Sequence, residues 1–270
     1  MKKPEVILCL DIDGTLINDQ EQVHPEDIKV LTNFPETIQL VLTTGRPLGS
    51  AKGVLHANNL YQDMTLPIPG VFMNGTAAYL PEEKLQEQHH FSENIRQELI
   101  KLAEKFKSST FAFFTLTHVH LINPTQFSLD VSKKHYLSFF ESNPVEIPNK
   151  INKMMVIEAD KDKLRLIKEH AIGIKAEIAY SLPYLLEFSP KGINKPAALK
   201  ALLTKLNLDG QPIYAVGDGQ NDLALFELAK INFAPSSAQQ NIRNKADHII
   251  QREQNGILSP VLETINKEIL

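Results

Sequence analysis

Two carboxylates stand two residues apart at the end of an apolar run near the start of the chain. In the stretch CLDIDGTLIND (residues 9–19), Asp11 and Asp13 directly follow the apolar residues 6–10, and Gly14 comes next. Because an isolated buried carboxylate is very costly, such groups must be paired, hydrated or bound to a ligand. By itself the pattern also fits a plain turn. It resembles a fragment of a calcium-binding loop as well, but the glutamate expected at the twelfth position of such a loop is missing. The pair is therefore a candidate for chemistry only if other groups join it.

Three further segments carry polar residues at comparable places, just after an apolar run or at the start of a predicted helix. These residues are Thr44 with Gly45 after the run 38–43, Lys195 at a helix start, and Asp218, Asn221 and Asp222 after the run 213–216. In an open α/β sheet, ligands bind outside the carboxyl ends of the parallel strands, so residues far apart in sequence meet there. Converging carboxylates repel one another unless a hard cation lies among them, and Mg²⁺ prefers carboxylate and phosphate oxygens. With a lysine, a threonine hydroxyl and backbone N–H groups nearby, the set predicts a phosphoryl-transfer site.

The elements that must position these residues alternate between strand and helix at the start of the chain. Apolar runs at 6–10, 38–43 and 70–73 predict buried strands, and Pro25 with acidic neighbours starts a helix between the first two. A strand, a helix and a second strand within about forty residues form a βαβ unit, which implies a parallel sheet with right-handed crossovers.

The middle of the chain has a different pattern, and the strand–helix alternation resumes after residue 187. The middle segment predicts a helix after Ser92, strands at 111–117 and 119–122, a helix at 131–140 and a strand at 153–158. The last segment predicts a helix capped by Asn194 and strands at 213–216, 231–234 and 248–250. The chain is therefore expected to carry an inserted α+β module within an α/β fold.

Four motifs in this order resemble those of the haloacid dehalogenase-like hydrolases. They are DIDGTLI, TTGR, a lysine opening a helix in GINKPAALKALL, and VGDGQNDLALF. The large insertion between the second and third motifs is similar to that of the Cof-type branch. This resemblance implies a Rossmann-like parallel-sheet core in residues 1–82 and 187–270, with an α+β cap domain in residues 83–186.

The resemblance also implies roles for individual residues. Asp11 would be the nucleophile that becomes an aspartyl-phosphate, and Asp13 would be the general acid and base. Phosphate binding would fall to Thr44, Gly45, Lys195 and Asn221, and Mg²⁺ binding to Asp11, Asp13, Asp218 and Asp222.

Some of these assignments have rivals within the sequence. Thr43 competes with Thr44, and Lys191 competes with Lys195. Asp222 could bind the metal directly or only support the metal site. Further substrate contacts are expected from Arg46, Asn74 and Lys153.

The implied activity is Mg²⁺-dependent hydrolysis of a small phosphorylated metabolite, either a sugar phosphate or a phosphorylated cofactor. Asp13 argues for rapid hydrolysis, because relatives that lack a second aspartate are dehalogenases or keep a long-lived phospho-enzyme. A phosphomutase of the same superfamily, or a catalytically silent metabolite-binding protein, are the alternatives.

Composition excludes several other classes of function. The chain has 270 residues, 43% of them apolar, and a formal net charge of −4, so no basic surplus points to a nucleic acid. The apolar run near the N-terminus is too short for a signal sequence or a membrane span, which makes the cytoplasm the expected location. The sequence predicts no oligomeric state.

Overall fold

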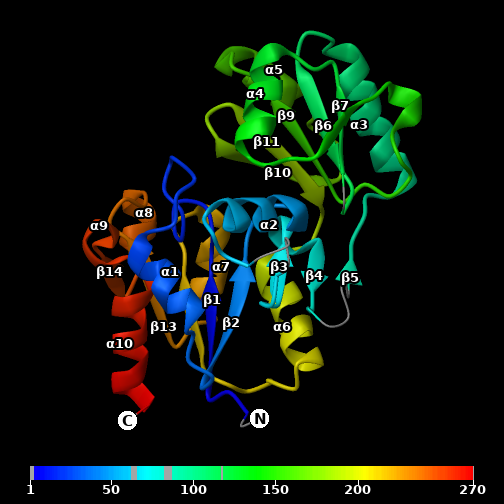
Figure 1. The fold of residues 1–270 in the computed structure, drawn as a ribbon. Helices are drawn as coiled ribbons and strands as arrows, with labels where there is room; N and C mark the ends of the chain where they lie inside the picture. Colours follow the sequence, from blue (N-terminus) through cyan, green and yellow to red (C-terminus); the bar gives the residue numbers. More distant parts are fainter. Residues whose placement is uncertain (1–2, 62–65, 82–86, 117, 270) are drawn as a thin grey trace. The chain divides into compact units, whose positions relative to one another are not determined.

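A computed structural model describes residues 3–61, 66–81, 87–116 and 118–269, which form two compact units (Figure 1). The core unit comprises Met1–Gly45, Lys52–Gln86 and Asn194–Leu270, and the inserted unit comprises Arg46–Ala51 and Glu87–Ile193. The division predicted at 82/83 lies outside the described residues. At the other end the structure divides the units after Ile193 instead of after residue 186, because β11 (Leu185–Pro190) pairs with two strands of the inserted unit.

The core unit is built on a sheet that has eight strands among the described residues. Its order is β14-β13-β12-β1-β2-β3-β4-β5, and the pairs from β14 to β3 are parallel. The bounds are β1 Val6–Leu10, β2 Ile38–Thr43, β3 Gly70–Phe72, β4 Ala77–Tyr79, β5 Glu87–Gln88, β12 Ile213–Val216, β13 Ile231–Pro235 and β14 His248–Ile250. β1 lies between β2 and β12, so residues that follow it emerge at the middle of the sheet.

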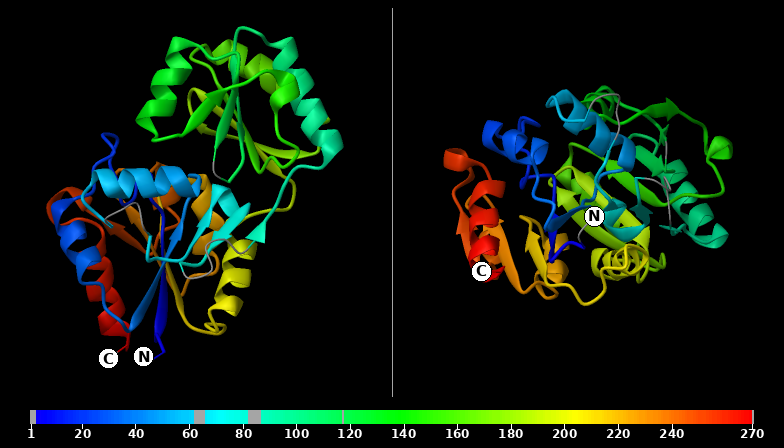
Figure 2. Two further views of the ribbon diagram at one scale, coloured as in Figure 1. Left: turned by 45° about the vertical axis from the view of Figure 1, so that its right-hand side comes forward. Right: turned by 60° about the horizontal axis from the view of Figure 1, so that its bottom comes forward.

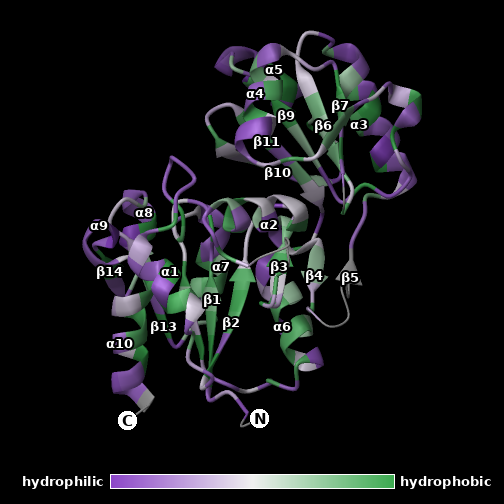
Figure 3. Cartoon of the chain, in the orientation of Figure 1, coloured by the Kyte–Doolittle hydropathy of each residue, from purple (hydrophilic) through white to green (hydrophobic). Residues whose placement is uncertain are grey.

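Helices cover both faces of this sheet. The helices of this unit are α1 Pro25–Thr32, α6 Lys195–Lys205, α7 Leu223–Phe226, α8 Gln240–Arg243, α9 Arg252–Asn255 and α10 Leu258–Ile269, together with the part of α2 (Leu48–Ala57) that begins at Lys52. On one face Cys9 and Val41 pack in a cluster with Leu199 of α6. Strand alternation turns the neighbouring Leu8 and Leu40 to the other face, and α1 and α10 lie side by side on that side of the sheet (Figure 2). β1 and most of β2 are hydrophobic (Figure 3), as expected for strands buried on both faces; the exceptions in β2 are the half-buried Gln39 and the terminal Thr43.

The inserted unit has its own sheet and its own apolar core. The sheet, six-stranded within the described part of the chain, has the order β10-β11-β9-β6-β7-β8. The remaining bounds are β6 Thr110–Phe114, β7 Val119–Ile122, β8 Phe139–Glu141, β9 Lys153–Ile157, β10 Ala176–Leu182, α3 Glu93–Lys105, α4 Gln126–Lys134 and α5 Lys161–His170. Phe111, Met154 and Phe188 pack there against Leu99 of α3 and Ile167 of α5.

The predicted fold class, an α/β fold with a parallel-sheet core and an inserted α+β module, is confirmed. The helix predicted over 131–140 is wrong in its second half, because α4 starts at a capping box on Thr125 and ends at Lys134. Phe139 and Phe140 instead form β8, whose backbone pairs in parallel with β7. The strand β10 at residues 176–182 was not predicted; its residues are half-buried or exposed at the edge of the sheet, so no apolar run marks it. No helix in the described residues is both long and apolar enough to cross a membrane.

Candidate active site

Asp11 lies at the end of the central strand of the core sheet. Its backbone N–H donates to the carbonyl of Val216 at 3.0 Å, so the pairing of β1 with β12 continues into the first residue of the site. The Asp11 side chain is buried, whereas Asp13 is half-buried. Gly14 follows with a φ of +70°, and a Cβ at this position would collide with Oδ2 of Asp218. A glycine is therefore required for the loop after β1 to pass beside the loop after β12.

Lys195 reaches the same place from the first turn of α6. The side chain of Asn194 caps this helix by accepting from the N–H of Ala197 at 2.9 Å. The apolar face of α6 packs on the sheet, which carries the Lys195 ammonium into the interior, where the residue is 2% exposed. Its Nζ donates to Asp11 Oδ1 at 3.1 Å, to Asp222 Oδ1 at 2.7 Å and to the carbonyl of Thr43 at 2.9 Å. All three ammonium protons therefore have acceptors.

Three carboxylates converge around this ammonium. Asp11, Asp218 and Asp222 each offer an oxygen, and these oxygens lie within 4.8 Å of one another. Burial, reinforced by the neighbouring Asp222, raises the pKa of Asp11 well above its usual range. Burial, with the charges of Asp222 and Asp13, raises the pKa of Asp218 to about 7. If all three carboxylates are ionised, their negative charge exceeds what one lysine can neutralise.

The same carboxylates also affect the pKa of Lys195. Burial alone would lower the pKa of Lys195, but the carboxylates of Asp11 and Asp222 outweigh it and raise this pKa above the usual value. The ammonium therefore stays charged. It compensates part of the negative charge, and the rest calls for a second cation.

The cluster fits a divalent metal ion by its donor set. Hard cations such as Mg²⁺ take oxygen ligands, and Asp11 and Asp218 both offer carboxylate oxygens. Asp13 follows two residues after Asp11. Asp222 is already engaged on both oxygens: Oδ1 accepts from Lys195, and Oδ2 accepts from the N–H of Gly219 at 3.0 Å. This geometry favours a supporting role for Asp222 over direct ligation.

Two more of the predicted residues, Asn74 and Asn221, meet beside this cluster. The side-chain amide of Asn221 donates to Asn74 Oδ1 at 3.1 Å, and the backbone N–H of Asn74 donates to the carbonyl of Thr44 at 3.2 Å. Of the two candidate threonines, Thr43 gives Lys195 its carbonyl, while its hydroxyl is buried without a hydrogen-bond partner among the described residues. Thr44 and Gly45 come immediately after it, at the end of β2.

The remaining predicted contacts belong to the inserted unit. Arg46 lies in the segment grouped with that unit and donates from Nη1 to Ser50 Oγ at 3.2 Å. Lys153 is buried on β9, where its Nζ lies 2.8 Å from a carboxylate oxygen of Glu187. Lys191, the rival of Lys195, is exposed after β11. Of the two lysines, Lys195 is the one that the structure shows donating to Asp11 and Asp222.

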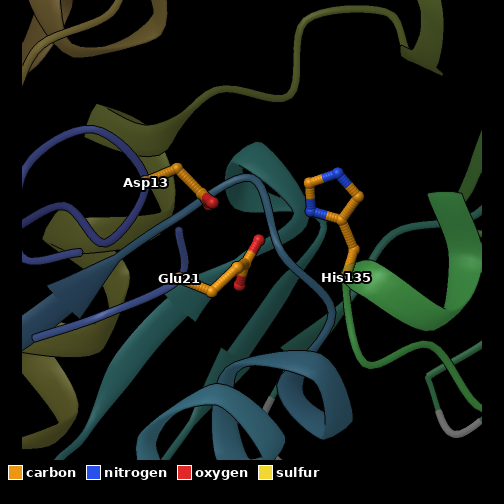
Figure 4. Close-up of side chains that lie close together, drawn as sticks. All are labelled: Asp13, Glu21 and His135. Atoms are coloured by element: carbon orange, nitrogen blue, oxygen red, sulfur yellow. The ribbon is translucent and has the colours of Figure 1, made fainter. Parts of the chain in front are cut away.

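Sequence reasoning missed Glu21, whose carboxylate points toward that of Asp13 (Figure 4). A carboxylate oxygen of each lies within 4.8 Å of the other. Figure 4 also draws His135, which follows α4 in the inserted unit. Glu21 has a left-handed backbone (φ +61°) in a loop held by Asn18, whose Oδ1 accepts from the N–H groups of Gln20 and Gln22. An Asn-led turn signal at position 18 is visible in the sequence, but nothing in it indicates where the turn places Glu21.

Comparison with known proteins identifies the family. A family model of the haloacid dehalogenase-like hydrolases matches residues 8–260, so the chain belongs to that family. The predicted resemblance is therefore confirmed. The predicted enzyme class, a hydrolase of phosphoric monoesters, is also confirmed by the family and by relatives that are named phosphatases.

Individual relatives are distant in sequence and similar in fold. A 5-amino-6-(5-phospho-D-ribitylamino)uracil phosphatase of Bacillus subtilis is 26% identical over 250 residues, which cover 90% of this chain and 88% of that protein. A haloacid dehalogenase-like hydrolase from Bacteroides thetaiotaomicron has a TM-score of 0.82 at 22% identity, covering 98% of this chain and 100% of that chain. A subclass IIB sugar phosphatase of the superfamily has a TM-score of 0.78 at 18% identity, and the match covers 97% of this chain and 99% of that chain.

One relative is much longer than this chain. The chloroplastic endoribonuclease YBEY of Arabidopsis thaliana is 24% identical over 266 residues, and the match covers 94% of this chain but only 45% of that protein.

The buried ammonium should be needed for stability as well as for binding. We predict that Lys195→Met lowers the free energy of unfolding by about 3 kcal/mol, because it leaves buried carboxylates without their partner. Urea denaturation without added metal measures this change. Lys191→Met, which removes an exposed lysine four residues earlier, should stay within about 0.5 kcal/mol of the wild type. Equal stability of the two variants would contradict the role given to Lys195.

Proposed function

We propose that the chain is a Mg²⁺-dependent phosphatase that hydrolyses a small phosphorylated metabolite through an aspartyl-phosphate on Asp11. The observation that carries this proposal is the buried Nζ of Lys195, which holds Asp11 and Asp222 together while Asp218 faces the same space. Such an arrangement keeps one carboxylate in place for attack, next to further carboxylate oxygens that suit a cation.

The metal would be held by Asp11, the backbone carbonyl of Asp13 and Asp218, with Asp222 fixing Lys195 beside them. When bound, Mg²⁺ would neutralise charge on the carboxylates and on the phosphoryl oxygens. Thr44, the backbone N–H of Gly45, Lys195 and Asn221 would bind the transferred phosphoryl group, with Lys195 acting as a point charge.

In the first step, a carboxylate oxygen of Asp11 attacks phosphorus in line with the ester oxygen. The new bond joins this oxygen to phosphorus, and the bond between phosphorus and the ester oxygen breaks. Asp13 donates its proton to the departing alkoxide, so the leaving group departs as a neutral alcohol. The products of this step are the alcohol and a phosphorylated Asp11.

In the second step, Asp13 is a carboxylate and takes a proton from water as that water attacks phosphorus. The bond between phosphorus and Asp11 breaks, inorganic phosphate leaves, and both aspartates return to their starting states. Two aspartates on one short loop can thus divide the work, because one reacts with phosphorus and the other only moves protons.

The names of two relatives support a proposal for the substrate class. The Bacillus subtilis relative is named for a phosphorylated ribityl compound, and a structural neighbour is named a sugar phosphatase. We therefore propose a phosphate ester of a sugar or sugar alcohol, free or attached to a ring as in a phosphorylated cofactor. Residues 83–186 would select the substrate, with Arg46 and Lys153 as proposed contacts.

The nucleophile can be tested by one substitution. We expect the wild type with Mg²⁺ to release phosphate from p-nitrophenyl phosphate and from members of a panel of sugar phosphates and phosphorylated cofactors. Asp11→Asn should lower kcat by about 10³-fold or more, because the amide cannot replace the carboxylate nucleophile. Phosphate release measured by a colorimetric assay reports both results.

A matched control is Asp19→Asn, which makes the same change at an exposed aspartate of the same loop and should leave kcat unchanged. No phosphate release by the wild type from any member of the panel would refute the phosphatase. Isomerisation of a hexose phosphate without net release would assign the chain to the phosphomutases instead.

The metal can be tested without any substrate. We predict that saturating Mg²⁺ raises the melting temperature of the wild type by about 5 °C, because the ion binds the folded carboxylate cluster and not the unfolded chain. Asp218→Asn should abolish most of this rise in differential scanning calorimetry. Asp209→Asn, at an exposed aspartate after α6, should retain it. An equal rise in the two variants would place the Mg²⁺ site elsewhere.

A further inference from the structure

The turn after β3 has an unusual backbone. Met73 and Asn74 are consecutive residues with positive φ, +49° and +56°, in the 3₁₀ turn Met73–Gly75. Residues other than glycine rarely adopt this left-handed backbone conformation, and two such residues in succession are a strained arrangement. Met73 is also completely buried. The surrounding structure must therefore hold the turn in place.

Asn74 joins two segments of the site. Its backbone N–H donates to the carbonyl of Thr44, which ties the turn to the loop after β2. Its Oδ1 accepts from the side-chain amide of Asn221 at 3.1 Å, which ties the turn to the loop after β12. The backbone of Gly45 also lies against it, since a Cβ there would come within 3.3 Å of Asn74 Oδ1.

The next residue joins the turn to a third segment. Gly75 has a φ of +106°, and a Cβ on it would lie 2.5 Å from the carbonyl oxygen of Asn194 and 3.2 Å from the N–H nitrogen of Lys195. The turn therefore abuts the start of α6, from which the Lys195 ammonium reaches Asp11. Segments that carry Thr44, Lys195 and Asn221 meet at this one turn.

We propose that Asn74 is a positioning residue, and that its strained turn is kept because it fixes Asn221 relative to Thr44 and Gly45. In this role Asn74 does not touch the substrate, in contrast to the contact predicted from the sequence. Asn221 would then present its amide to the phosphoryl group in one orientation. The inference rests on the phosphatase proposed above, and it names a residue that acts through Asn221.

The substitution Asn74→Gly separates this role from a structural one. Glycine adopts the left-handed backbone without strain, so the melting temperature should stay the same or rise. Loss of the Oδ1 acceptor should nevertheless lower kcat by about five- to tenfold, the effect of one hydrogen bond, with a smaller change in KM. Asn207→Gly is the matched control, because Asn207 is also left-handed (φ +55°) but is exposed between α6 and β12. This variant should lose the same left-handed backbone strain and keep the wild-type kcat.

A double-mutant cycle tests the link to Asn221. If Asn74 acts through Asn221, the double variant Asn74→Gly/Asn221→Ala should have the same kcat as Asn221→Ala alone. The proposal would be overturned if the double variant had a lower kcat than Asn221→Ala, as expected when the two effects multiply. It would also be overturned if Asn74→Gly had the wild-type kcat or changed only KM.

A second measurement does not depend on activity. In ¹⁵N spectra of the full chain, Asn74→Gly should shift the side-chain amide signal of Asn221, and Asn207→Gly should not. An unshifted signal would overturn the inference. An inactive wild type would refute the proposed phosphatase, while this spectrum would still decide the role of Asn74.

Discussion

Lys195 places an ammonium group between the carboxylates of Asp11 and Asp222 in the interior of the core unit. Three carboxylates cannot share so small a space without compensating charge, and this one cation is supplied by the chain itself. The three carboxylates form a cluster that could hold a divalent ion. The protons of this ammonium are donated to Asp11, Asp222 and the carbonyl of Thr43, so the lysine is held in one position beside Asp11.

The scaffold is what makes this arrangement possible. Lys195 and Asp11 are 184 residues apart in sequence, yet β1 ends at the middle of a parallel sheet and α6 packs on one face of it. The carboxyl ends of parallel strands form a common edge, so each loop contributes one part of the site. The turn after β3 then abuts the other loops, and its strained backbone is offset by the hydrogen bonds of Asn74.

The sequence predicts the parallel strands of the core sheet, from β14 to β3, because buried parallel strands are continuous apolar runs. It does not predict β4, β5, β8, β10 or β11, which lie outside that run of strands. The contact between Asn74 and Asn221 could not be predicted, since it joins loops 147 residues apart that have no periodic pattern. Glu21 was missed because the sequence shows a turn at Asn18 but not where that turn places the Glu21 side chain. The helix predicted over 131–140 failed at Phe139 and Phe140, where pairing with β7 outweighs local helical spacing. Tertiary pairing decides such short segments, and their local pattern does not.

Phosphorylation of Asp11 is the central step of the proposed reaction, and borohydride trapping measures it directly. In Asp13→Asn the second step lacks its base, so the phospho-enzyme should accumulate when p-nitrophenyl phosphate and Mg²⁺ are added. Reduction with borohydride followed by peptide mass spectrometry should then find homoserine at position 11 and at no other aspartate. Phosphate release by the wild type without any trapped product at Asp11, or trapping at a different residue, would contradict the account.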